Sequence, residues 1–174
     1  LVTLGASLPV RIVRAELCTR VDGFGQFETI PSRRLVAGRS HRMIVYVELD
    51  RFAHRALADA GAASGSTSGV SSVGSAGPSP ALREGFEVEL TQELRLLHDA
   101  DGALAMMRPA QRVRESLRSV RRDFYVVQEI ELPATLATGS YTLRIRMRDV
   151  VGGTATESAI ALTLVADATT ARAE

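Results

Sequence analysis

The sequence lacks tryptophan and lysine, and it has a single cysteine among its 174 residues. One cysteine excludes an internal disulfide, a zinc site built from four cysteines and a Cys-x-x-Cys redox pair. Within a strand pattern, Cys18 is expected to be a small core residue. Because only 5% of the residues are aromatic, the chain has little with which to stack on sugar rings. No apolar run reaches the roughly 18 residues of a membrane span, so no direct membrane insertion is predicted.

Neither sign of charge is in large excess, because the formal net charge is only +1. The chain therefore has no overall field to attract nucleic acid, and no nucleic-acid partner is expected. Length and ordinary hydrophobic content favour one domain. We expect a flexible lead-in at residues 1–9, one domain at 10–165 and a polar tail at 166–174. Residues 61–80, rich in glycine and serine, predict a flexible, disordered insertion within that domain, with a domain boundary as the alternative.

Apolar and polar residues alternate with a period of two along most of the chain, which is typical of half-buried strands. Helical periodicity is nearly absent. Residues 23–27 are expected to form a loop in which two aromatic rings turn back toward the core, and the arginine-rich residues 108–122 are expected to form a short helical turn or a loop. The pattern predicts an all-β antiparallel sandwich of seven strands, at residues 10–21, 42–50, 86–98, 103–107, 124–132, 141–149 and 155–165.

Pro133, Leu136 and Gly139 precede Tyr141 at the start of the strand before last. This arrangement resembles the tyrosine corner of immunoglobulin-like and fibronectin type III-like domains; the alternative is that Tyr141 merely opens a strand. The resemblance implies an immunoglobulin-like sandwich in which the phenol reaches back to a backbone group and 86–98 lies beside 141–149. Antibody domains are excluded, because their cysteine pair and core tryptophan are missing.

The predicted pairing of 86–98 with 141–149 would set glutamates against arginines on their outward faces, which favours pairing. The residues concerned are Glu87, Glu89 and Glu93 on one strand and Arg144, Arg146 and Arg148 on the other. The run from Tyr141 to Arg146, with Asp149 after it, is also similar to the last strands of bacterial envelope domains. That similarity implies an accessory module of a larger extracytoplasmic protein.

Catalytic and metal-binding motifs are not found in the sequence. The three histidines, His41, His54 and His98, lack metal-ligand spacing and are expected to be solvated. Asp99 and Asp101 before Gly102 resemble a fragment of a calcium loop, but further ligands are missing and a hairpin turn is expected instead. We therefore predict no enzyme, no cofactor and no metal site.

The densest basic feature is an arginine cluster, which is a candidate site for an anion or a partner. The sequence predicts a non-catalytic structural or protein-interaction module whose partner is another protein or a domain of the parent chain. The alternative function is binding of an anionic glycan or polymer through this cluster, and the alternative structural interpretation is pairing with local carboxylates. Its members are Arg108, Arg112, Arg114, Arg118, Arg121 and Arg122.

Overall fold

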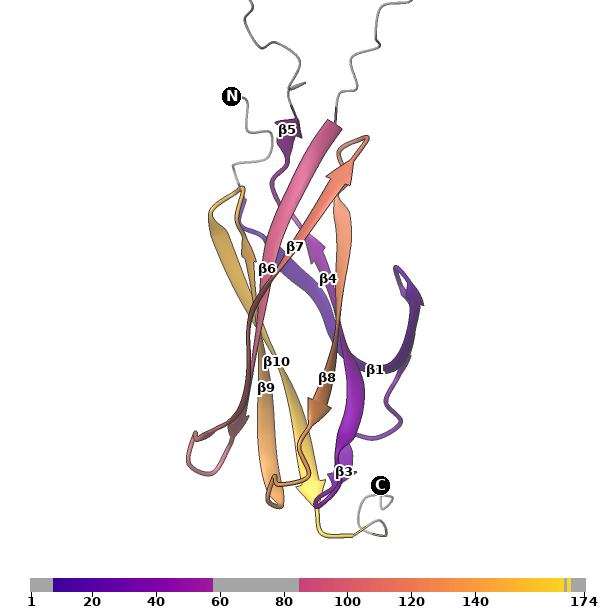
Figure 1. The fold of residues 1–174 in the computed structure, drawn as a ribbon, viewed down its shortest axis with the longest axis vertical. Helices are drawn as coiled ribbons and strands as arrows, with labels where there is room; N and C mark the ends of the chain where they lie inside the picture. Colours follow the sequence, from indigo (N-terminus) through magenta and orange to yellow (C-terminus); the bar gives the residue numbers. More distant parts are fainter. Residues whose placement is uncertain (1–7, 58–84, 168, 170–174) are drawn as a thin grey trace, which may run out of the picture.

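The computed structural model describes residues 8–57, 85–167 and 169, and every regular element in them is a β-strand (Figure 1). The predicted insertion at 61–80 lies outside these residues, as do most of the lead-in and of the tail. The strands are β1 (Arg11–Gly23), β2 (Gln26–Thr29), β3 (Arg34–Val36), β4 (His41–Asp50), β5 (Arg55–Leu57), β6 (Gly85–His98), β7 (Leu104–Leu117), β8 (Asp123–Leu132), β9 (Gly139–Asp149) and β10 (Thr154–Val165).

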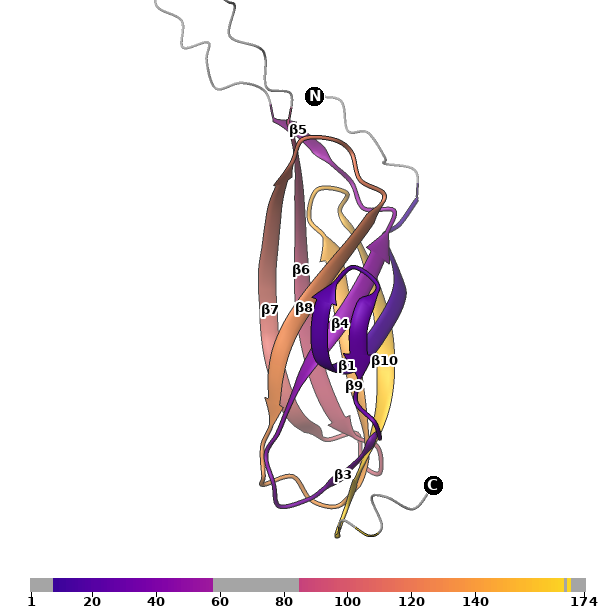
Figure 2. The same cartoon turned by 90° about the vertical axis from the view of Figure 1, so that its right-hand side faces the viewer.

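Two sheets form the sandwich-like, all-β fold (Figures 1 and 2). The smaller sheet has the order β2-β1-β4-β8. The larger has the order β3-β10-β9-β6, with β5 and β7 both paired to β6. All pairs are antiparallel except β3 with β10.

The structure contains ten strands in its described part, three more than the seven predicted from the sequence. Residues 26–29 pair with β1 as β2, so the loop expected at 23–27 is a tight hairpin instead. The expectation of a helical turn or loop at 108–122 is wrong for most of that segment, because β7 continues to Leu117. Its residues pair with β6 through the backbone while most of its side chains are exposed, so no apolar periodicity marks it as a strand.

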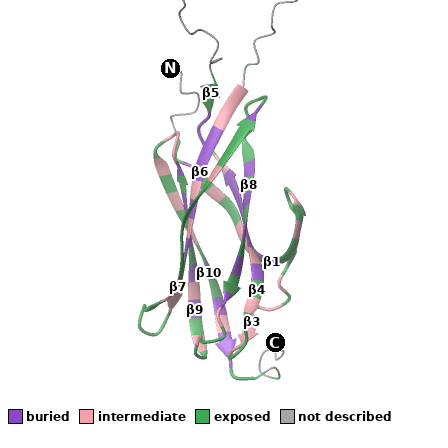
Figure 3. Ribbon diagram, in the orientation of Figure 1, coloured by how far each residue is buried: buried purple, intermediate pink, exposed green. Residues whose placement is uncertain are grey.

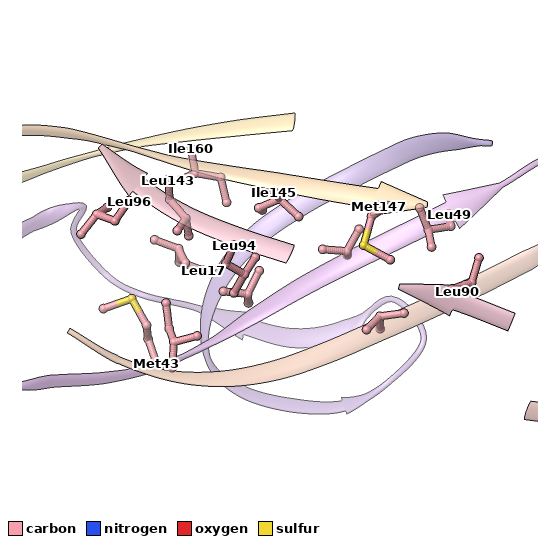
Figure 4. Close-up of a cluster of buried hydrophobic side chains, with 14 of the residues drawn as sticks. Leu17, Met43, Leu49, Leu90, Leu94, Leu96, Leu143, Ile145, Met147 and Ile160 are labelled. Carbon is pink, nitrogen blue, oxygen red and sulfur yellow. The ribbon is translucent and has the colours of Figure 1, made fainter. Parts of the chain in front are cut away.

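The core lies between the sheets and is filled by the inward side chains of both (Figure 4). Leu94 and Leu96 of β6 and Ile145 of β9 are fully buried on one side. Val45 and Val47 of β4 are fully buried on the other. Burial of each such side chain stabilises the fold by roughly 1.5–3 kcal/mol relative to exposure. These central strands therefore form the framework on which the other strands of each sheet lie.

The predicted pairing of residues 86–98 with 141–149 is confirmed by the register of β6 and β9, in which Glu93 stands opposite Arg146. The predicted charge pairing is wrong, because Glu93 pairs with Arg95 of its own strand and Arg146 pairs with Glu157 of β10. Glu87 and Glu89 bind arginines of β5 and β7, and Glu89 is only 3% exposed. The reason is that long arginine side chains from β5 and β7 lie over β6 and cover it.

Tyr141 closes the corner between β8 and β9. Its hydroxyl donates a hydrogen bond of 2.9 Å to the carbonyl oxygen of Ala137, and its ring lies 5.0 Å from that of His98. Leu136 packs against the core and donates its N–H to the carbonyl of Pro133. Gly139 has a φ of 151°, and a Cβ there would meet the His98 ring at 2.7 Å, so only glycine fits.

We expect Tyr141→Phe to lower the free energy of unfolding by about 1 kcal/mol, because it removes this hydrogen bond and keeps the buried ring. Urea unfolding followed by circular dichroism measures the change. Tyr125→Phe is the control, because Tyr125 is partly exposed and its hydroxyl makes no hydrogen bond in the described residues. Equal stabilities of the two variants would show that the Tyr141 hydroxyl contributes nothing.

Candidate functional site

The sandwich is open on the side where β7 and β8 face each other from different sheets (Figure 2). No backbone pairing joins these two strands in the residues described, so each leaves one edge free. Two hollows lie along this side. One of about 380 Å³ is lined by Val113 and Glu115 of β7 and by residues 123–127, and one of about 270 Å³ is lined by Arg108, Arg42 and residues 129–131.

Strand β8 is an unprotected edge. Its ten residues include no proline and no glycine, and buried and exposed positions alternate without interruption (Figure 3). Natural edge strands usually carry proline, bulges or charged side chains that prevent further pairing, and in β8 the outward charges are confined to its two ends, at Asp123, Glu129 and Glu131. At the centre of β8, Tyr125 and Val127 point outward and are 37% and 48% exposed. The free edge of β8 is therefore suited to accept another strand.

The hairpin of β1 and β2 folds over the outer face of the smaller sheet next to this edge. Tyr46 is fully buried beneath it, with its hydroxyl accepting a hydrogen bond from the N–H of Gly25 and donating one to Glu48. Its ring contacts Phe27 at 4.5 Å and Tyr125 at 5.8 Å. Phe24, which is exposed, packs edge-on against Tyr125 and extends the apolar surface beyond β8.

The predicted arginine cluster is divided among three places. Arg112 and Arg114 hold the carboxylate of Glu89 at 3.1 and 3.2 Å. Arg108 lines the second hollow. Arg118, Arg121 and Arg122 lie in the connection between β7 and β8, where Arg121 lines the first hollow. The cluster therefore borders the open side along its whole length but does not converge on one anion.

No protein-family model and no curated protein sequence matches this chain.

His54 is buried, at 4% exposure, which corrects the expectation that it is solvated. Its ring packs between Phe52 and Phe86, and its Nε2 accepts a hydrogen bond from the backbone N–H of Arg121 at 3.3 Å. Burial lowers its pKa, while the nearby charge of Asp149 acts in the opposite direction. The neutral ring thus holds the segment that leads into β8.

Stability is expected to fall as the pH drops below about 6.5, the ordinary pKa of histidine. Because the pKa of His54 is lower in the folded protein, the unfolded chain binds more protons as the pH falls through this value. The contribution of His54 is complete above that pH and is lost in acid. Urea unfolding at several pH values should show a steeper acid loss for the wild type than for His54→Gln, and parallel curves would contradict this role.

The remaining sequence candidates are engaged in local structure. Asp101 accepts hydrogen bonds from the N–H of Ala103 and from His98 within a hairpin turn, and Asp99 accepts one from Thr142. Burial raises the pKa of the Cys18 thiol to about 11, which keeps it protonated at neutral pH. Across residues 8–57 and 85–167, no three His, Cys, Asp or Glu side chains are grouped to hold a metal ion. No helix in the same ranges is long and apolar enough to cross a membrane.

Proposed function

We propose that this chain is a non-catalytic, immunoglobulin-like module of a larger protein, and that it binds another protein by accepting an extended strand at the free edge of β8. The observation that carries the proposal is the unpaired, unprotected edge of β8 with exposed apolar residues at its centre. Strand addition supplies affinity through backbone hydrogen bonds and specificity through alternate side chains.

The immunoglobulin-like assignment is supported by the tyrosine corner and by the division of the strands. β1, β4 and β8 share one sheet, while β6, β9 and β10 share the other, as expected for the two sheets of such a domain. Because β7 pairs with β6 in the opposite sheet, β8 has a hydrogen-bonded neighbour on one side only among the described strands. One further strand can therefore be added beside β8.

The same contacts favour a protein partner over an anionic polymer or a substrate. Two arginines of the cluster are already ion-paired with Glu89, and β8 itself presents Asp123, Glu131 and the Arg42-paired Glu129 beside the hollows. The most buried carboxylate, Asp149, is bound to backbone N–H groups and not directed into a hollow. An extended segment with basic and apolar residues in alternation fits this surface best.

An array of ten-residue peptides, matching β8 in length, tests the proposal. Peptides that alternate arginine, valine and threonine should bind the wild type, and proline-substituted copies should not. Val127→Lys, which adds a charge to the exposed centre of the edge, should abolish binding. Val13→Lys is the matched control because Val13 is similarly exposed but lies on β1. Absence of binding to every alternating peptide, or equal binding to both variants, would overturn the proposal.

A further inference from the structure

Resting on the proposed function, we propose that the strand accepted by β8 is β7 of a second copy of this chain. The two copies form a two-fold dimer in which β8 of each copy pairs with β7 of the other, so both open edges of both copies are closed at once.

The fold makes this pairing geometrically consistent. β7 and β8 are consecutive, run in opposite directions and border the same open side. A two-fold axis parallel to the strands brings the smaller sheet of one copy into line with the larger sheet of the other. β8 then meets the partner's β7 in antiparallel orientation, and outward faces join outward faces. This isologous contact closes on itself and requires no further copies.

Rotation about such an axis does not shift a residue along the strands. A residue of β7 and a residue of β8 that lie at the same height in one copy therefore stand opposite each other across the dimer interface, one from each copy. The first hollow brings Val113 and Glu115 to the level of residues 123–127, and the second brings Arg108 to the level of residues 129–131. A ladder that keeps outward residues together and lies within two residues of these levels sets Arg112 opposite Glu129, Arg114 opposite Val127 and Arg118 opposite Asp123.

Charge complementarity favours β7 as the occupant. The outward positions of β8 carry Asp123, Glu129 and Glu131, so pairing β8 with a second β8 brings like charges together. β7 and its continuation set Arg118 opposite Asp123, and Arg112 opposite Glu129 beside the ion pairs that these two residues already make with Glu89 and Arg42. Pro109 and the register shift of β7 lie before Gln111, so the regular edge from Gln111 to Leu117 stays available.

Mutants with reversed charge at one predicted pair test the dimer. Asp123 and Arg118 suit this purpose, because neither makes an ion pair within the described structure and both are exposed. Asp123→Arg and Arg118→Asp should each weaken the dimer about tenfold, as expected for the loss of one charge contact that occurs twice. Mixing the two variants in equal amounts should restore dimerisation, because both interfaces of the mixed dimer then hold one Arg–Asp pair.

Sedimentation equilibrium of the 174-residue chain over a wide concentration range, at low and moderate salt, measures the mass. Arg39→Asp and Glu28→Arg make the same charge changes on exposed residues that line neither hollow, and they should leave the dimer unchanged. Circular dichroism confirms that each variant is folded.

A wild type that stays monomeric overturns the dimer, as does a dimer that both single variants leave intact or that mixing fails to restore. Monomeric wild type that still binds alternating peptides, with loss in Val127→Lys, leaves the proposed function standing with a different partner. Failure of both experiments removes the binding role of β8 altogether.

Discussion

Replacing Asp149 with alanine is expected to lower the free energy of unfolding by about 3 kcal/mol, because two hydrogen bonds to a charged acceptor are lost, each worth roughly 1.5–3 kcal/mol. Asp149 is 1% exposed at the end of β9. Its Oδ2 accepts the N–H of Ala53 at 2.7 Å, and its Oδ1 accepts the N–H of Gly152 at 2.9 Å. Ala53 lies where the chain leaves β4 for β5, so this carboxylate ties the crossing between the two sheets to the last hairpin.

Two further variants separate the lost hydrogen bonds from a general effect of mutation. Asp149→Asn keeps one side-chain oxygen, and we expect it to recover about half of the loss, measured by urea unfolding. Asp99→Ala removes an exposed carboxylate that accepts only the hydroxyl of Thr142, and it should change stability by less than about 0.5 kcal/mol. An Asp149→Ala protein as stable as the Asp99→Ala protein would contradict the role of Asp149.

The second large effect is expected when Arg112 and Arg114 are both replaced by alanine. The carboxylate of Glu89 then keeps only Arg55, at 3.9 Å, and loses two of the arginine side chains that cover it. Removing the partners of a buried charge typically costs about 3–5 kcal/mol. Both arginines are about half exposed, and water replaces them in part, so we expect a loss of about 2 kcal/mol.

Removing the charge itself tests this explanation. Adding Glu89→Gln to the double variant should recover part of the lost stability, because a neutral amide is less costly to bury than an unpaired carboxylate. The matched control is Arg39→Ala with Arg122→Ala, two exposed arginines that make no ion pair among the described residues and belong to no predicted pair of the dimer. We expect the control to stay within about 0.5 kcal/mol of the wild type in urea unfolding. A triple variant less stable than the double variant would contradict the role assigned to Glu89.

The alternation that predicted residues 124–132 and 86–98 as strands reports which side chains face the core. It therefore predicted the positions of β8, β6 and β9 well, and Tyr141 indicated the corner that joins β8 to β9. The start of β7 was predicted as the strand at 103–107, but its continuation at 108–117 escaped prediction, because side chains beyond Met107 cover little of the core and follow no period. The burial of Glu89 was missed for a related reason: its cover consists of arginines, which count as polar in any hydrophobic pattern.

The free edge of β8 could not be predicted from its own residues. Whether Val127 lies beside another strand depends on which sheet β7 joins, and β7 joins β6 through backbone hydrogen bonds that side-chain periodicity does not record. Similarly, nothing near His54 in the sequence indicates that its ring meets the N–H of Arg121, 67 positions later. Both features arise from the pairing of distant segments.

The described chain enters the sandwich at one end of its long axis and leaves it at the other (Figure 1). The N–H of Val10 is fixed to Thr154 at the start of β10, whereas β10 ends at the opposite pole, where its last residues run parallel to β3. A tensile load applied to the two ends therefore acts along the strands. Resistance would come from hydrogen bonds of β10 with β9 and β3 that are sheared together rather than opened one at a time, and it would be set by the rate of unfolding.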